Sequence, residues 1–187
     1  MILPIALYPH PFLRRRMQPV EKITDEIQAL AENMIETMRN APGVGLAAPQ
    51  VLADARLFVI QPDTEDPSTT QVFINPEIIA REGKMELYEE GCLSIPGVLA
   101  KVRRPWVIRV RFQDLKGQWQ EARFEGFPAR VIQHEFDHLD GVLFLDRLPQ
   151  LRRRLLRKDL QAVEEGKIRP GYPFVHPRLR PQPQTIG

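Results

Sequence analysis

Apolar residues recur at helical spacing over residues 24–39, the clearest periodic pattern in the chain. Asp25 and Glu26 lie in what would be the first turn, and Pro42-Gly43 follows the last one. Acidic residues stabilise the start of a helix, whereas proline and glycine favour its end. The positions on the apolar face are Ile27, Leu30, Ala31, Met34, Ile35 and Met38. This pattern predicts an amphipathic helix near the N-terminus.

The pattern changes to that of β-strands between Arg56 and Glu125. The segments RLFVI and QVFIN and the alternating residues 106–113 are rich in β-branched and aromatic side chains, which favour strands. Turn signals stand between the apolar segments at Asn75-Pro76, Pro96-Gly97 and Asp114-Leu115-Lys116-Gly117. Short turns join neighbouring antiparallel strands, so we expect an antiparallel, twisted sheet.

Helical segments follow the predicted strands. Pro128 suits the first turn of a helix that would continue through residues 133–138 and end near Gly141. A last helix is predicted from an apolar stripe whose opposite face carries arginines. The stripe consists of Leu148, Leu151, Leu155, Leu156, Leu160 and Val163. Because the strands do not alternate with helices, the order indicates an α+β fold: an antiparallel twisted β-sheet around a central helix, with N-terminal and C-terminal amphipathic helices.

The length of 187 residues is enough for one stable core and short for two domains. The final stretch contains five prolines and almost no apolar periodicity. We therefore predict a single domain over residues 1–168, followed by a proline-rich tail over residues 169–187. Such a tail would be extended and of the kind that is often mobile.

Composition and charge limit the possible cellular locations and partners of the protein. The chain has one cysteine, so no disulfide can form within it, and it shows neither a leader-like apolar segment nor a run of about 20 apolar residues. We expect a cytoplasmic protein without a membrane segment, while an organellar origin with a removed transit peptide stays open. The formal net charge of +2 does not point to DNA. The charges are uneven, however, because Arg147–Lys158 is basic and residues 63–66 and 82–90 are acidic.

Residues 133–138, with the sequence QHEFDH, have a spacing typical of a metal site. His134 and His138 stand four residues apart, which places both imidazoles on one face of a helix. Glu135 is turned by about 100° around the helix axis, so it is poorly placed as a third ligand and well placed to handle a proton of water on the metal. The alternative is a helix with two half-buried, hydrogen-bonded histidines, which would leave Glu135 without a task.

Several residues compete for the place of the third ligand. The metzincin pattern H-E-x-x-H-x-x-G-x-x-H fails here, because Phe144 stands where the last histidine belongs. Glu164 or Glu165 on a following helix could supply a carboxylate ligand. Cys92 is the only cysteine, and a lone cysteine is often just a small buried side chain. If Cys92 does bind, one thiolate and two imidazoles would leave a fourth position open for water, as catalytic sites do.

Three separated motifs resemble, in their order, those of the peptide deformylase family. They are GVGLAAPQ at residues 43–50, EGCLS at residues 90–94 and QHEFDH at residues 133–138. The similarity extends from about Tyr8 to Leu148, and the ordered set is highly specific. The family hydrolyses the formyl group from the N-terminal formylmethionine of new polypeptides and releases formate. The resemblance therefore implies a metal-dependent hydrolase that acts on formyl-methionyl nascent peptides.

The resemblance also implies a metal-ligand set and a proton carrier. Cys92, His134 and His138 would hold one divalent ion, usually Fe²⁺ in such enzymes, with Zn²⁺, Ni²⁺ or Co²⁺ also able to bind. Glu135 would be the general acid and base.

Further residues would contact the substrate. By resemblance, the side-chain amide of Gln50 and the backbone N–H of Leu93 donate to the oxyanion, and Gly45 gives close backbone contact. As a hypothesis, the methionine side chain enters an apolar pocket lined by Val44, Phe127, Val131 and the stem of Arg130.

Two expectations concern the surroundings of this site. Some members carry an arginine several residues after the cysteine motif, but Leu99 and Ala100 stand there in this chain, which leaves substrate-backbone contacts at this place unassigned. Glu90 would be a buried carboxylate beside the site and would need a cation, so we predict that it pairs with Arg104.

Other functions would share some of these features. The H-E-x-x-H arrangement also cleaves internal amides, so a metallopeptidase is the alternative enzyme. A metal that only folds the chain would give a non-enzymatic binding module. Some deformylases contact the ribosome through a C-terminal helix, and a solvated charged face is the simpler explanation for the basic helix here. The residues that would meet ribosomal RNA are Arg152, Arg153, Arg154, Arg157 and Lys158.

Overall fold

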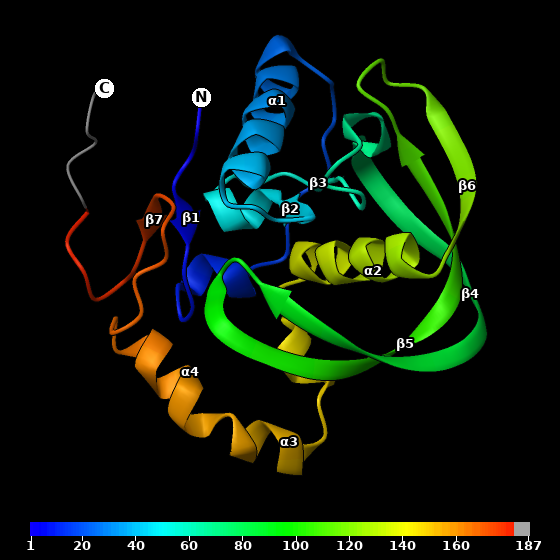
Figure 1. Cartoon of the computed structure of the whole chain (residues 1–187). Helices are drawn as coiled ribbons and strands as arrows, with labels where there is room; N and C mark the ends of the chain where they lie inside the picture. The colour runs from blue at the N-terminus through cyan, green and yellow to red at the C-terminus, as the bar shows by residue number, and fades with distance from the viewer. Residues whose placement is uncertain (182–187) are drawn as a thin grey trace.

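The computed structural model describes residues 1–181 (Figure 1). The helices are α1 (Asp25–Asn40), α2 (Phe127–Leu139), α3 (Gln150–Leu155) and α4 (Arg157–Glu164). The strands are β1 (Ile5–Ala6), β2 (Gly45–Ala47), β3 (Leu57–Ile60), β4 (Gln71–Cys92), β5 (Ile95–Gln113), β6 (Trp119–Glu125) and β7 (Phe174–Val175). Single 3-10 turns occur at η1 (Pro11–Arg14), η2 (Ala48–Val51), η3 (Pro67–Thr69) and η4 (Phe144–Arg147).

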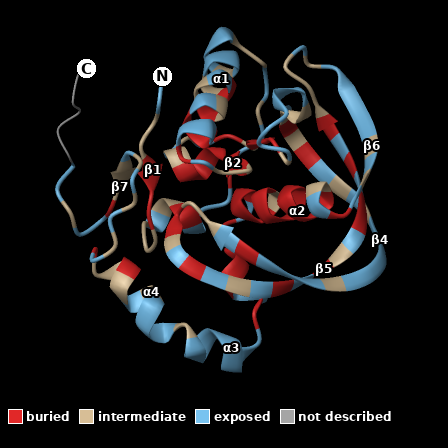
Figure 2. Cartoon of the chain, viewed as in Figure 1, coloured by how far each residue is buried: buried red, intermediate tan, exposed pale blue. Residues whose placement is uncertain are grey.

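The predicted α+β architecture is confirmed. Strands β2 to β6 form one antiparallel sheet in sequence order, and the sheet curves around α2 (Figure 1). Most of α2 is buried, as the red colour in Figure 2 shows. Its apolar side chains, among them Ile132 and Leu139, pack in one cluster with Phe58 and Phe73 from the sheet. The helix that carries both histidines is therefore the centre of the core.

The predicted N-terminal helix is confirmed as α1. It begins after Thr24, whose hydroxyl accepts a hydrogen bond from the backbone N–H of Ile27 at 3.4 Å, the usual arrangement of an N-cap. Its apolar face packs on β2 and β3, with Met34 and Met38 fully buried. Among residues 1–181, no helix is both long and apolar enough to cross a membrane.

Two of the three predicted turns between strands are wrong. Asn75-Pro76 lies inside β4, and Pro96-Gly97 lies inside β5. At Asn75 the pairing with β5 shifts register, and the backbone has a φ of 51°. These residues bend long strands instead of ending them, as β-bulges do. The turn predicted at residues 114–117 is confirmed between β5 and β6.

The last predicted helix is broken into two short helices. α3 ends at Leu155 and α4 begins at Arg157, so the predicted stripe does not lie on one face. Leu148 and Val163 are buried, but Leu151 is 67% exposed and Leu155 is 73% exposed. The prediction is wrong for these last two leucines, because α3 does not pack its apolar side on the core.

Part of the predicted tail is docked on the domain. β7 pairs in parallel with β1, and His176 is buried with its Nε2 donating to the Val163 carbonyl at 2.7 Å. These contacts hold the segment around residues 173–176 against the N-terminal strand. Residues 182–187, the end of the predicted tail, lie outside the described part of the chain. A domain boundary at residue 168 stays a prediction.

Candidate metal centre

Two secondary-structure elements bring together three side chains that could hold a metal ion. His134 and His138 lie one turn apart on α2, and Cys92 is the last residue of β4. The ligand atoms of the three side chains all lie within 4.8 Å of one another, and the Cys92 Sγ is 3.4 Å from the His138 Nε2. A tetrahedral ion with ordinary metal–sulfur and metal–nitrogen bonds would separate a sulfur and a nitrogen ligand by about 3.5 Å. The donor set therefore fits a single metal ion.

The alternative third ligands do not join this cluster. Within residues 1–181, the group of possible metal ligands that contains both histidines includes Cys92 and neither Glu164 nor Glu165. The two glutamates instead line a polar surface groove beside α4. Burial lowers the pKa of His138 well below its usual value, an effect that the positive charge of its neighbours reinforces. A neutral imidazole is the form that binds a metal.

Glu90 orients the first histidine. Its Oε1 accepts a hydrogen bond from the His134 Nδ1 at 2.8 Å, which leaves the His134 Nε2 free to face a metal. Burial alone would raise the pKa of Glu90, but the hydrogen bond with His134 and the ion pair with Arg104 outweigh burial and lower the pKa to about 2. Glu90 is therefore ionised at neutral pH and can hold this tautomer.

Arginines surround the Glu90 carboxylate. Arg104 donates from Nε to the Glu90 Oε2 at 2.6 Å and from Nη2 to the Oε1 at 3.0 Å, which confirms the predicted pair. Arg130 donates to the same Oε2 at 2.6 Å, and Arg104 also contacts the Asp137 Oδ2 at 3.0 Å. All four side chains are buried. The network links the metal helix α2 to the β4–β5 hairpin.

Two members of this network were missed in the sequence. Asp137 stood at an unconstrained place of the histidine motif, and Arg130 was expected only as a pocket wall. A signal was present for Arg130, because it precedes His134 by four residues and so shares the face of α2 that carries the histidines.

Glu135 lies beside the ligand cluster. Its Oε1 is 4.0 Å from the His134 Nε2, and its buried Oε2 has no hydrogen-bond partner among the described residues. Burial, aided by the charges of Glu90 and Asp137, raises the pKa of Glu135 to about 7. A carboxylate with this pKa can both accept and return a proton near neutral pH.

Gly45 lies against this glutamate. A Cβ at position 45 would lie 2.8 Å from the Glu135 Oε1, closer than real Cβ contacts allow. The absence of a side chain at Gly45 therefore allows the Glu135 side chain to pack against the glycine-rich motif.

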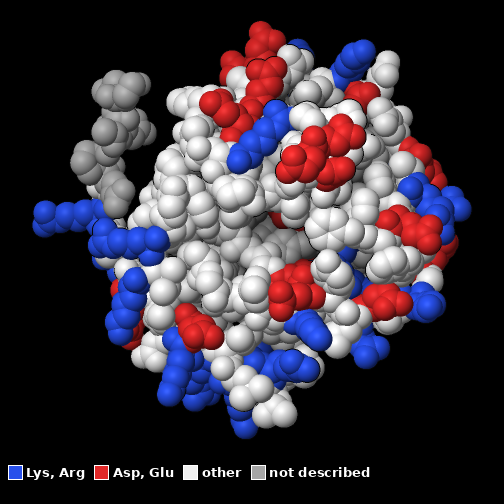
Figure 3. Space-filling model, in the orientation of Figure 1, with Lys and Arg blue, Asp and Glu red and all other residues white. Residues whose placement is uncertain are grey.

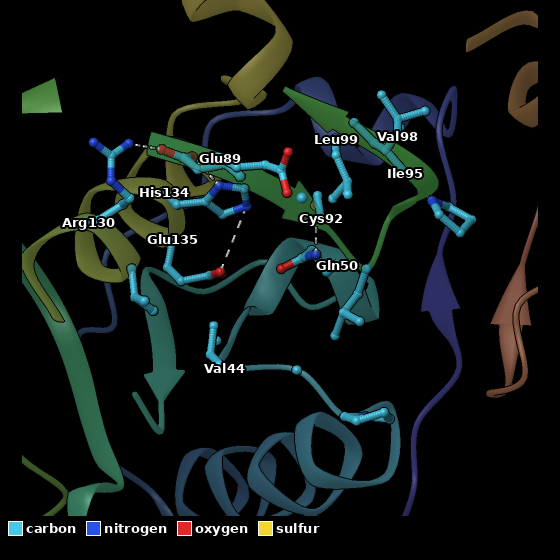
Figure 4. A pocket seen from close by; sticks show the side chains of 18 of the residues that line it. Val44, Gln50, Glu89, Cys92, Ile95, Val98, Leu99, Arg130, His134 and Glu135 are labelled. Carbon is cyan, nitrogen blue, oxygen red and sulfur yellow. Dashed lines mark hydrogen bonds and ion pairs between the residues drawn. The ribbon is translucent and has the colours of Figure 1, made fainter. Parts of the chain in front are cut away.

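Gln50 and Leu93 both lie next to Cys92. The Gln50 Oε1 accepts a hydrogen bond from the backbone N–H of Ala47 at 2.9 Å, which turns the Nε2 toward Cys92. The Nε2 is 3.5 Å from the Cys92 Sγ (Figure 4), and it donates to the Ser94 Oγ at 3.0 Å. Leu93 occupies the turn between β4 and β5, directly after the cysteine. The side-chain amide of Gln50 and the backbone of Leu93 are therefore both next to the Cys92 thiol.

A cavity of about 460 Å³ opens above these residues. It forms the hollow at the centre of the face in Figure 3, and Figure 4 shows Val44, Cys92 and Glu135 around it. The four residues predicted for the substrate pocket all line this cavity: Val44, Phe127, Arg130 and Val131. Leu99 lies at the rim and is 58% exposed. The cavity is large enough for a methionine side chain and the adjoining peptide.

Comparisons with known proteins agree with this site. The family described as polypeptide deformylase matches residues 2–154. The peptide deformylase of Salinibacter ruber is 47% identical over 185 residues, covering 94% of this chain and 95% of that protein. The peptide deformylase of Afipia carboxidovorans is 50% identical over 162 residues, covering 86% and 95%.

Solved structures agree as well. The crystal structure of peptide deformylase from Thermus thermophilus matches with a TM-score of 0.83 and 45% identity, over 89% of this chain and 99% of that one. The enzyme from Synechococcus elongatus, solved in complex with actinonin, matches with a TM-score of 0.79 and 39% identity, over 96% and 92%. This chain therefore belongs to the peptide deformylase family, metal-dependent hydrolases that remove the N-formyl group from nascent polypeptides.

Proposed function

We propose that Cys92, His134 and His138 hold one Fe²⁺ ion, which Zn²⁺, Ni²⁺ or Co²⁺ could replace. The observation that carries this proposal is the clustering of one sulfur and two imidazole nitrogens within 4.8 Å, beside a buried carboxylate that binds none of them. Thiolate and imidazole ligands accept several of these metals, and the preference for Fe²⁺ rests on the family resemblance.

The protein residues would divide the hydrolysis between them. A divalent metal at this site would supply a Lewis acid that lowers the pKa of water and polarises the formyl oxygen. Glu135 would take a proton from the attacking water and deliver it to the departing amine, for which its pKa near neutrality is suited. The Gln50 amide and the Leu93 backbone N–H would donate to the oxyanion from fixed positions. The absence of a side chain at Gly45 makes room for the Glu135 carboxylate, and the Gly45 backbone would contact the substrate beside it.

The proposed chemistry is tested by purifying the chain without oxygen, measuring its metal content, and following formate release from a formyl-methionyl tripeptide. We expect about one metal ion per chain and release of formate. An unformylated longer peptide is the control, because a tight site at the metal accepts a formyl hydrogen and excludes a side chain. Cleavage of only the longer peptide would favour the metallopeptidase alternative.

Val44 tests the proposed pocket for methionine. The residue lines the cavity together with Phe127 and Val131, and a tryptophan at position 44 would fill space that the methionine side chain needs. We expect Val44→Trp to raise KM for formyl-methionyl peptides by about tenfold or more, since loss of apolar burial of this size costs at least about 1.5 kcal/mol. Val72→Trp on β4, outside the cavity lining, is the control for a bulky change. Unchanged kinetics in Val44→Trp would refute the pocket assignment.

We also propose that the basic surface of α3 and α4 contacts ribosomal RNA. Arg153, Arg154 and Arg157 line a polar groove together with Arg178 from the C-terminal segment, and Figure 3 shows basic side chains gathered over this side of the molecule. Clustered arginines can neutralise phosphates. A formylated nascent peptide would then be presented where it emerges. A cytoplasmic location, as predicted from the sequence, is part of this proposal.

The ribosome proposal predicts a charge-dependent association. Replacing Arg152, Arg153, Arg154, Arg157 and Lys158 by glutamine should weaken co-sedimentation with ribosomes by about tenfold or more at low salt, and the salt dependence should become shallower. Formate release from a free tripeptide should not change, since α3 and α4 lie away from the cavity lining. If the variant co-sedimented as the wild type does, with the same salt dependence, these residues would form only a solvated charged surface and the ribosome proposal would be wrong.

A further inference from the structure

The C-terminal segment reaches the metal centre through Tyr172. This tyrosine lines the same cavity as Cys92 and Glu135, although it lies beyond the predicted end of the catalytic domain. Its hydroxyl donates to the backbone carbonyl of Leu93 at 2.5 Å. A residue 79 positions away in the chain therefore contacts the turn that follows the metal-binding cysteine.

The backbone that directly follows Tyr172 is held in place. The N–H of Ile5 donates to the Pro173 carbonyl at 2.9 Å, and the N–H of Leu7 donates to the Val175 carbonyl at 2.8 Å. The buried His176 anchors the segment to α4. The Tyr172 ring packs on the same apolar cluster as Leu93. A hydroxyl on so constrained a ring can fix the position of its acceptor.

The turn at residues 92–95 is held from other directions as well. The Gln50 Nε2 donates to the Ser94 Oγ, and the backbone N–H of Tyr8 donates to the Ser94 carbonyl at 2.8 Å. These two bonds fix Ser94, whereas the bond from Tyr172 fixes Leu93 itself. Burial raises the pKa of Tyr172 well above its usual value, so the phenol remains a donor throughout the physiological range.

We propose that Tyr172 is a positioning residue for deformylation, which sets the orientation of Leu93 so that its backbone N–H faces the oxyanion. This inference rests on the proposed role of the Leu93 N–H. An oxyanion donor is effective when it is oriented before the reaction, because no reorganisation is then needed in the transition state. Holding the Leu93 carbonyl limits rotation of the residue whose N–H must stay aimed. The C-terminal segment is therefore part of the active site, and its docking completes it.

Tyr172→Phe tests this role by removing only the hydroxyl. We expect kcat for a formyl-methionyl tripeptide to fall roughly tenfold, less than for direct loss of an oxyanion donor, while KM stays within about twofold. The Leu93 and Ser94 backbone amides should exchange with deuterium faster than in the wild type, because the turn loses one restraint. The melting temperature should fall by no more than a few degrees, as expected for the loss of one hydrogen bond, and the metal content should not change. Tyr88→Phe is the matched control, since Tyr88 is 52% exposed and outside the cavity lining.

Each alternative result would overturn the inference. A kcat within twofold of wild type would show that the hydroxyl does not position the site, even if amide exchange became faster. A loss of metal in proportion to the loss of activity would show a structural role instead. An equal fall in Tyr88→Phe would mean that the effect is not specific. Formate release by the wild type tests the proposed function separately, because the inference depends only on the ratio between variant and wild type.

Discussion

Replacing Glu135 by glutamine should lower kcat for formate release by about 10³-fold, within the range expected for loss of a general acid and base. Glutamine keeps the shape of the side chain and cannot carry the proton from water to the amine. The metal should remain, because the ligands that we propose are Cys92, His134 and His138 and do not include Glu135. Formate release under single-turnover conditions, together with metal analysis of the same sample, would measure both quantities.

The control for Glu135→Gln is Glu121→Gln on β6, an exposed glutamate on the sheet. The control should keep wild-type kinetics. Loss of the metal in Glu135→Gln would make Glu135 a ligand, and activity within tenfold of wild type would assign the proton transfer to another group.

The pH profile gives a second check on Glu135. The base must be deprotonated to act, so kcat/KM should rise with pH through its pKa. Without a metal, burial places that pKa at about 7. A nearby dication favours the carboxylate, so the acid limb of the metal-loaded enzyme should have its midpoint below 7.

The features that the sequence predicted well depend on local spacing. His134 and His138 were placed together by the geometry of a single helix, and α1 was predicted from its periodicity and first turn. Cys92 was different, because its approach to the histidines depends on how a 22-residue strand folds back over α2. Residue spacing alone left Cys92 in competition with Glu164 and Glu165. The chemistry of a Cys-His-His ligand set and the resemblance of the motifs favoured the cysteine.

The features that the sequence did not predict depend on contacts between distant segments. Asn75-Pro76 and Pro96-Gly97 are strong turn signals, yet strand pairing on both sides turned them into bends within β4 and β5. Tyr172 stands in a proline-rich segment with no periodicity, and its task arises only because β7 pairs with β1. Composition predicted an extended segment but could not show that β7 packs against β1.

The buried ion network should make Arg104 a major determinant of stability. Arg104→Met would leave Glu90 and Asp137 buried with fewer positive partners, and breaking a buried pair in this way costs about 3–5 kcal/mol. Arg130 still contacts Glu90, and Arg147 still contacts Asp137, so we expect the lower end of that range. Urea unfolding of the metal-loaded protein at pH 7 would measure the free energy of unfolding.

The pH dependence of unfolding should distinguish loss of this ion network from an ordinary loss of packing. The pKa of Glu90 is lowered to about 2 in the folded chain, against an ordinary value of 4.5, so its contribution to stability is complete above pH 4.5 and is lost as the pH falls through 2. Without Arg104, the pKa of Glu90 should move up toward its ordinary value. Protonation would then release the His134 Nδ1 at a higher pH, and both unfolding and metal loss should begin at a higher pH than in the wild type.

Arg109→Met supplies the matched control for Arg104, since both residues lie on β5 and both pair with a glutamate on β4. The Arg109 pair with Glu82 spans 3.8 Å and is about half exposed on both sides, so its loss should change the free energy of unfolding by less than about 1 kcal/mol. The two variants differ mainly in burial. Suppose that both variants lowered the free energy of unfolding equally and left the pH of acid unfolding unchanged. The loss of stability in Arg104→Met could then not be attributed to the burial of Glu90 beside His134, and the prediction that Arg104 supports the metal site would be wrong.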